Sequence, residues 1–241
     1  MKLHVFKRPE EVIVALADFV VSVARESIRK NGGFNFVLSG GGSPRKLFEL
    51  LASPVYRNQI EWQSVYFFFG DERYVPLDHM DSNFLMTKGT LFDPLGISED
   101  HIFAVNTALL PEAAALDYNN RIINHFKPEA CRFDLILLGL GDNSHTASLF
   151  PNTSVLYEKK ACIKEIFVEE VNMYRVTFTA PLINAAHNIA FLVYGHSKAE
   201  AVQHILNDPL NIEEYPAQLI NSDRGALHWF MDEAAAGYNL N

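Results

Sequence analysis

The feature of this sequence that most constrains its fold is a buried strand that ends in a polar loop hinged by glycine. Residues 133–138 form a run that is apolar except for Asp134, which is typical of a strand buried on both faces of a sheet. Gly139 and Gly141 follow the run directly. The loop then supplies four polar side chains, Asp142, Asn143, Ser144 and His145. Since open α/β sheets bind ligands at the carboxyl ends of their strands, we expect His145 to lie at a ligand site.

Two earlier apolar runs end in the same way. Residues 34–38 lead into a glycine cluster at 40–42, and residues 65–69 lead into Gly70 and then Asp71 and Arg73. Further strands are predicted over 101–105, 162–168, 175–179, 189–194 and 217–220, and helices over 9–30, 83–95, 111–126, 181–186, 197–206 and 225–236. Strands that alternate with helices predict an α/β fold, a single domain over residues 1–241 whose mainly parallel, doubly wound sheet carries helices on both faces.

Two details of the helices also follow from the sequence. Ser43 and Ser197 are good capping residues, so we expect each to begin the helix that follows it. The apolar spacing over 111–126 predicts that one set of side chains faces inward, namely Ala113, Leu116, Ile123 and Phe126.

Composition excludes several classes of protein. The net charge of −9 argues against nucleic acid or an anionic membrane as a partner, because both require a basic surface. No apolar run approaches the roughly 18 residues of a membrane span. The first residues become acidic before any core of signal-peptide length, so a cytoplasmic protein is expected. Cys131 and Cys162 form neither a disulfide framework nor a zinc motif.

The glycine cluster has the chemistry of an anion cradle. Gly41 and Gly42 allow close approach of a ligand to the backbone, and the free amides at the start of the helix point toward an oxyanion. The segment is neither a Walker loop nor GxGxxG, since Arg45 stands at the third glycine position. An ordinary strand-to-helix turn would have the same sequence, and both interpretations are open at this point.

The chemistry of His145 also has two interpretations. It could be a structural histidine, or a general base with a pKa near the working pH, which its polar neighbours Asp142, Asn143 and Thr146 favour. Asp71 and Arg73 could likewise be a surface ion pair or part of a site. Lys198 and Arg175 are cations near the ends of later elements and could close on an anion.

Other chemistries lack their sequence signatures. Residues 139–144 miss the dinucleotide fingerprint because Ser144 occupies the third glycine position, so no nicotinamide or flavin cofactor is expected. Residues 41–45 fail the GxSxG pattern of a nucleophilic serine. The histidines are scattered and form no HExxH, so no metal is expected.

Three segments together resemble the 6-phosphogluconolactonase family, within the wider group that includes the glucosamine-6-phosphate isomerases. They are LSGGGSPRKLFELL at 38–51, FFFGDERYVPLDHMDSNFLM at 67–86 and LLGLGDNSHTASLFPNT at 137–153. The resemblance extends over nearly the whole chain through PLINAAHNIAFLVYGHSKAEAV at 181–202. HTASLFP is its most specific part.

The resemblance implies hydrolysis of 6-phosphoglucono-1,5-lactone to 6-phosphogluconate in the pentose phosphate pathway, without metal or cofactor. His145 would act as base for a water molecule, and Arg73, with backbone amides near Gly141, would stabilise charge on the carbonyl oxygen. The substrate phosphate would be held by Gly41, Gly42 and Ser43, with Lys198 and Arg175 as counter-charges. The partner would thus be a small phosphorylated sugar lactone.

One departure from the family pattern is informative. The usual loop has aspartate and glycine before the histidine, whereas this chain has Asn143 and Ser144. We therefore expect Asp142 to supply the charge that an amide cannot. Two alternatives stay open: an isomerase or deaminase, which would carry a carboxylate five residues after the histidine, where this chain has Phe150, and a sugar-phosphate sensor without activity.

Overall fold

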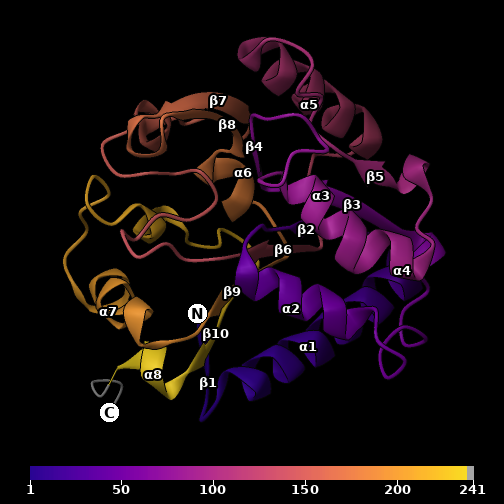
Figure 1. The fold of residues 1–241 in the computed structure, drawn as a ribbon, viewed down its shortest axis with the longest axis horizontal. Coiled ribbons are helices and arrows are strands. Elements are labelled where there is room, and N and C mark those ends of the chain that lie inside the picture. Colours follow the sequence, from indigo (N-terminus) through magenta and orange to yellow (C-terminus); the bar gives the residue numbers. More distant parts are fainter. Residues whose placement is uncertain (238–241) are drawn as a thin grey trace.

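The computed structural model of the protein describes residues 1–237; the last four residues of the predicted domain, 238–241, lie outside the described residues. Within residues 1–237, seven strands form one sheet in which every neighbouring pair is parallel. Their order is β1 (Lys2–Phe6), β10 (Ala226–Asp232), β9 (Asn188–Val193), β6 (Leu135–Leu138), β2 (Phe34–Leu38), β3 (Val65–Phe69) and β5 (Ile102–Phe103). The predicted α/β fold with a mainly parallel sheet is confirmed (Figure 1).

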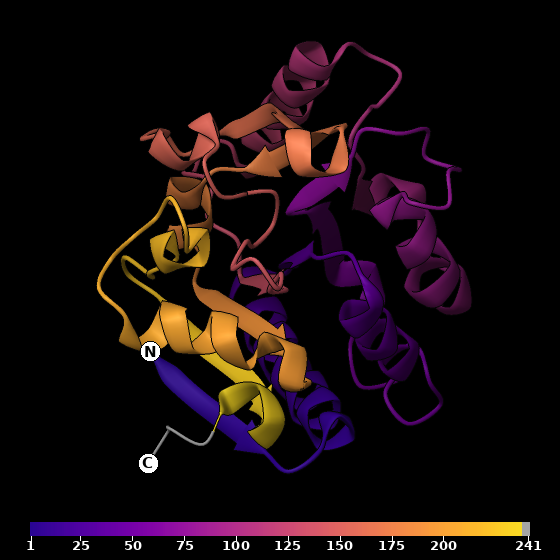
Figure 2. The same cartoon turned by 60° about the vertical axis from the view of Figure 1, so that its left-hand side comes forward.

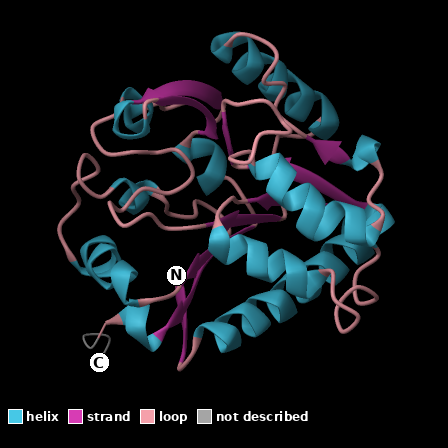
Figure 3. Cartoon of the chain, in the orientation of Figure 1, coloured by secondary structure: helices cyan, strands magenta, loops and turns pink. Residues whose placement is uncertain are grey.

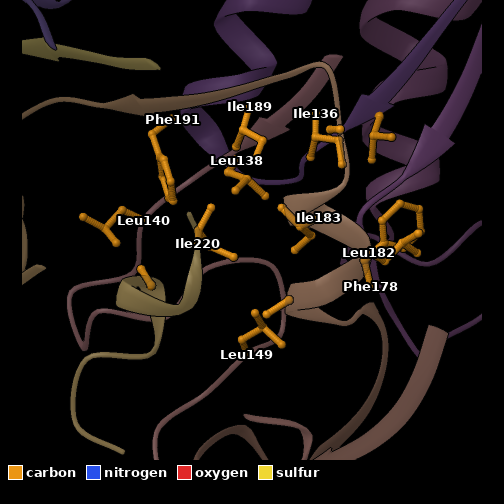
Figure 4. Packing of buried hydrophobic residues seen from close by; sticks show 14 of the residues in the cluster. Ile136, Leu138, Leu140, Leu149, Phe178, Leu182, Ile183, Ile189, Phe191 and Ile220 are labelled. Carbon is orange, nitrogen blue, oxygen red and sulfur yellow. The ribbon is translucent and has the colours of Figure 1, made fainter. Parts of the chain in front are cut away.

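The central strands are buried on both faces because successive side chains enter two different cores. Leu135 and Leu137 of β6 belong to one core, and Ile136 and Leu138 to the other. This alternation explains why the sequence reads as an unbroken apolar run. Figure 4 shows Ile136 and Leu138 in the second core, beside Ile189 of β9.

Helices cover both faces of the main sheet (Figure 3). The first core is closed by α1 (Pro9–Asn31) and α2 (Gly42–Leu51). A helical stretch beside them comprises α3 (Asn83–Thr87), a π-helical turn (Lys88–Phe92) and α4 (Asp93–Leu95). The second core is closed by α5 (Pro111–Phe126), α6 (Ala180–Asn184), α7 (Ala199–Asn207) and α8 (Glu233–Ala236). None of the helices in residues 1–237 is long and apolar enough to cross a membrane.

A small antiparallel sheet stands apart from the main one and was not predicted as a separate sheet. In the described part of the chain it has three strands, in the order β4 (Asp71–Arg73), β8 (Met173–Phe178) and β7 (Ile163–Val168). The chain enters this sheet directly after β3, and the Phe178 amide donates a hydrogen bond to the Gly70 carbonyl at 2.8 Å. The small sheet is therefore fixed at the carboxyl end of β3.

The C-terminal predictions were partly wrong. Residues 226–232 form the strand β10 rather than a helix, because Trp229 and Met231 enter one core and Phe230 the other, as in β6. Strand β1, which was not predicted, pairs with β10, and Figures 1 and 2 both show the two side by side. The predicted strand at 217–220 is a 3-10 turn, Pro216–Leu219.

Three predicted helix details were also wrong. Helix α2 begins at Gly42 with Gly41 as its cap, so Ser43 lies inside the first turn, and Ser197 lies in the 3-10 turn His196–Lys198 that precedes α7. In α5 the buried stripe is rotated from the predicted one: Leu116 and Ile123 are exposed. The buried residues are Ala114, Ala115, Tyr118 and Ile122. The two alanines allow the helix to approach closely, which brings Tyr118 to the sheet.

The Tyr118 hydroxyl connects α5 to the end of β3. It accepts a hydrogen bond from the Phe69 amide at 2.7 Å and donates one to the Phe69 carbonyl at 3.1 Å. Both backbone groups are buried, as is Tyr118. Substitution Tyr118→Phe would leave them without partners, so we expect a loss of roughly 1–3 kcal/mol in the free energy of unfolding measured with urea.

The matched control is Tyr157→Phe. Its hydroxyl also forms a hydrogen bond, to Glu213, but at an exposed position where water can replace the partner. We expect this change to stay within about 0.5 kcal/mol. Equal effects of the two substitutions would contradict the bridging role of Tyr118.

Candidate active site

A cleft of about 360 Å³ lies at the carboxyl edge of the main sheet. It is lined by the loops that follow β2, β6 and β9, and by residues of the small sheet. Eight of the ten predicted site residues line it, namely Gly41, Gly42, Ser43, Asp71, Arg73, His145, Arg175 and Lys198. Asp142 and Asn143 are not among the lining residues and lie directly beside them in the chain. Fold topology thus brings together residues that are more than 150 positions apart in the sequence, such as Gly41 and Lys198.

The glycine loop offers backbone amides to the cleft. Gly41 has φ 101°, a conformation that side chains rarely adopt, and helix α2 begins directly after it. The first amides of a helix have no acceptor within the helix, and no side chain caps this end. The amides of Gly42 and Ser43 therefore face a site that suits an anion, with the favourable end of the helix dipole behind them.

Two arginines lie opposite each other on adjacent strands of the small sheet. Arg73 of β4 and Arg175 of β8 are direct partners in the antiparallel register, an arrangement of like charges that normally destabilises a sheet. The Nε atoms of both are buried and have no hydrogen-bond partner among residues 1–237. Burial lowers the pKa of Arg175. The charge of Asp71 raises this pKa, and the charge of Arg73 lowers it. Two guanidinium groups with unused donors on the wall of a cleft favour an anionic ligand.

His145 is held by its own loop. Its Nδ1 lies 2.5 Å from Asn143 Oδ1, and its backbone amide donates to the same oxygen at 3.3 Å. The Phe150 ring stacks on the imidazole with 3.9 Å between ring centroids. Gly141 lies so near that a Cβ there would stand 2.1 Å from His145 Nδ1. Only glycine fits at position 141.

Two residues of the loop already have partners within the protein. The Gly141 amide donates to the His145 carbonyl at 2.8 Å, so it is not free to bind a substrate oxygen. Within residues 1–237 the Asp142 carboxylate pairs with Lys198 at 2.5 Å and forms no hydrogen bond to His145, although its charge raises the pKa of the imidazole. The hydrogen-bond partner of the imidazole is Asn143, which in turn donates to Glu170 at 2.8 Å.

Burial lowers the pKa of His145 from 6.5 to about 4. Among the nearby charges, Asp71 and Asp142 raise the pKa of His145, whereas Arg175 and Lys198 lower it further. The ring is therefore neutral at pH 7. A neutral imidazole in a cleft can accept a proton, which a permanently charged one cannot.

A buried carboxyl beneath the cleft was missed from the sequence. Glu72 accepts hydrogen bonds from the backbone amides of Arg73, Asn83 and Phe84, and so ties β4 to the start of α3. Burial raises its pKa to about 7 despite these donors. Its neighbour Asp71 accepts a hydrogen bond from the Ser148 hydroxyl at 2.7 Å. The alternation of Asp71, Glu72 and Arg73 on a short strand was the signal that Glu72 points away from the cleft.

The residues at the cleft do not include a metal cluster. Within residues 1–237, no three histidine, cysteine, aspartate or glutamate side chains come together so that they could hold a metal ion. The donors that do converge there are amides, guanidinium groups, an ammonium group and one neutral imidazole. Fold and cleft define an α/β protein with a candidate anion-binding site and a candidate base at the carboxyl edge of its sheet.

Comparison with known proteins identifies the family. Residues 7–229 match the sequence model of the glucosamine-6-phosphate isomerases/6-phosphogluconolactonase family, so the chain belongs to this family. The 6-phosphogluconolactonase of Synechocystis sp. is 41% identical over 219 residues, which cover 89% of this chain and 88% of that protein. The 6-phosphogluconolactonase of Nostoc sp. is 35% identical over the full length of both chains, 247 aligned residues. The solved 6-phosphogluconolactonase of Trypanosoma cruzi superposes with a TM-score of 0.88 at 26% identity, covering 100% of this chain and 97% of that one.

The lowered pKa of His145 gives a direct test of the site. In an NMR titration we expect the ring to change charge near pH 4, and the midpoint to rise in Lys198→Met, because this change removes a cation and leaves Asp142 without its partner. Since the folded pKa lies below the ordinary 6.5, the neutral ring contributes stability that is complete above about pH 6.5 and is lost as the pH falls toward 4.

The control for this titration is Lys127→Met, which removes a surface cation hydrogen-bonded to Asn124 and outside the cleft. It should leave the midpoint unchanged. A His145 midpoint near 6.5 in the unmodified protein would contradict the burial of the ring.

Proposed function

We propose that this chain is a 6-phosphogluconolactonase, which hydrolyses 6-phosphoglucono-1,5-lactone to 6-phosphogluconate in the pentose phosphate pathway. The observation that carries the proposal is a neutral, half-buried imidazole in the same cleft as two arginines with unused donors and a helix start with free amides. The relatives from Synechocystis sp. and Nostoc sp., 41% and 35% identical to the chain, bear the name of this enzyme. The proposed partner is a small phosphorylated lactone, and a cytoplasmic location stays a prediction.

The phosphate would bind at the glycine loop. The amides of Gly42 and Ser43 supply hydrogen bonds, and Lys198 and Arg175 supply positive charge at the same cleft. The chain as a whole has a net charge of −9, so these local cations have to overcome an unfavourable overall field. Anchoring the distant phosphate fixes the lactone carbon in front of His145 and turns binding energy into orientation.

The chemistry then requires only a positioned water molecule. His145 Nε2 takes one proton as the water oxygen attacks the lactone carbonyl, and a tetrahedral intermediate forms. Arg73 stabilises the negative charge on the former carbonyl oxygen. The imidazolium then returns the proton to the ring oxygen as its bond to the carbonyl carbon breaks, and the ring opens to the free acid. No covalent enzyme intermediate is needed because a lactone is an activated ester.

The low pKa of the free histidine is compatible with this role. A base with a pKa of about 4 is fully unprotonated at pH 7, though weak. A bound phosphate adds two negative charges to a cleft where Arg175 and Lys198 now lower the pKa. Binding of the substrate therefore raises the basicity of His145 at the moment it is used.

The isomerase or deaminase alternative lacks its acid/base group here. Phe150 occupies the position of that carboxylate, and its ring stacks on His145. Turnover of glucosamine-6-phosphate by the purified protein would reverse our ranking. A sensor without activity would bind 6-phosphogluconate and leave the rate of lactone hydrolysis unchanged.

The decisive experiment is a coupled lactonase assay of the wild type and His145→Ala, with the spontaneous hydrolysis of the lactone subtracted. Loss of the base should lower kcat by about 10²–10⁴-fold with a smaller change in KM, since the phosphate contacts stay in place. The matched control is His204→Ala, which changes a histidine of α7 outside the cleft and should leave both constants unaltered. Equal rates for His145→Ala and wild type would defeat the assignment.

A further inference from the structure

We propose that Glu170 is a positioning residue for His145 and acts through the side chain of Asn143. The proposal rests on the proposed function, which makes His145 the base. Glu170 belongs to the 3-10 turn Glu169–Val171, which connects β7 to β8, and it lines the rim of the cleft. It has no part in the contacts assigned so far to phosphate or to the reacting oxygen atoms.

The Asn143 amide group lies between the two side chains. Its Nδ2 donates to Glu170 Oε2 at 2.8 Å, and its Oδ1 lies 2.5 Å from His145 Nδ1. A carboxylate can only accept hydrogen bonds, so Glu170 requires the NH₂ group of Asn143 to point toward it. The carbonyl oxygen of Asn143 must then point toward His145.

This orientation decides which imidazole nitrogen carries the proton. Facing a carbonyl oxygen, Nδ1 has to be the donor, so the hydrogen of the neutral ring is on Nδ1 and the lone pair is on Nε2. Within residues 1–237 His145 Nε2 forms no hydrogen bond, and the ring lines the cleft. The lone pair is thus available to a water molecule there.

Besides Glu170, one other group in the described residues holds the amide in this orientation, the His145 backbone amide, which donates to Asn143 Oδ1 at the longer distance of 3.3 Å. Loss of Glu170 would therefore leave the orientation of the amide only weakly fixed. A half turn about the last side-chain bond would present NH₂ to Nδ1, which would then have to accept, and the hydrogen would move to Nε2. That tautomer cannot take a proton from water at Nε2. The carboxylate also places a negative charge one side chain beyond the ring, where it favours the imidazolium formed during the reaction.

The arrangement is specific to an amide at position 143. An aspartate there would need no partner to accept from Nδ1, and it would repel Glu170 because two carboxylates would meet at hydrogen-bond distance. Glu170 should therefore help the reaction when residue 143 is asparagine and hinder it after Asn143→Asp. This reversal of sign distinguishes a direct contact from a general effect of charge.

The first test compares Glu170→Ala with its neighbour on the same turn, Glu169→Ala, in the lactonase assay. We expect kcat of Glu170→Ala to fall about three- to tenfold with little change in KM, the effect of losing one solvent-exposed hydrogen bond. Glu169→Ala removes the same charge from the same turn without contacting Asn143, and should leave both constants unchanged. Equal values for the two variants would overturn the proposal.

The second test is the double-mutant cycle. In the Asn143→Asp background, the change Glu170→Ala should raise kcat rather than lower it. The same loss in both backgrounds would show that Glu170 acts independently of residue 143, and would overturn the proposal.

A third measurement separates this proposal from the proposed function. The ¹⁵N chemical shifts of the His145 ring report its tautomer at neutral pH, whether or not the protein is a lactonase. We expect the Nδ1–H form in the wild type and in Glu169→Ala, and a mixture of both forms in Glu170→Ala. A wild type without lactonase activity but with this pattern would refute the function and support the link; an unchanged tautomer in Glu170→Ala would refute the link.

Discussion

The constraint on which the rest of the structure depends is the burial of β6 on both faces. Its side chains alternate between two cores, so the strand cannot shift by one residue without exchanging the two sets. β6 also lies in the middle of the sheet, between β9 and β2. The end of β6 at the edge of the sheet is therefore fixed, and so is the position at which the loop that carries His145 begins.

The cleft at this edge of the sheet contains groups whose arrangement lowers the stability of the fold. Arg73 and Arg175 face each other with buried, unpartnered Nε atoms, and His145 is held neutral by burial. Such groups persist when the surrounding structure determines their positions and a ligand completes them. Two buried side chains support the cleft. Glu72 accepts hydrogen bonds from the backbone amides of Arg73, Asn83 and Phe84, and Tyr118 bonds the backbone at the end of β3.

What could be predicted from the sequence was local. The strands at 34–38, 65–69 and 133–138 and the loops that follow them were predictable because apolar runs and glycine turns express short-range rules. The strand at 226–232 was mistaken for a helix, since ALHWFMD is apolar enough for either and only pairing with β1 and β9 decides. The small sheet, the stacking of Phe150 and the contact of Asn143 with Glu170 depend on segments that meet only in the folded chain. Asp142 was expected to supply charge to His145, and its carboxylate does raise the pKa of the imidazole. The contact of Asn143 with the ring depends on side-chain direction, which cannot be read from a sequence.

The buried position of His145, stacked on the Phe150 ring, has a consequence for the reaction as product accumulates. Opening a lactone yields a carboxylic acid, which releases a proton at neutral pH, so each turnover acidifies the surroundings. A histidine with an ordinary pKa would be switched off progressively by its own product. With a pKa of about 4 in the free protein, the ring is unprotonated well below neutrality, so the free form of the proposed enzyme keeps its base ready to accept a proton as acid accumulates.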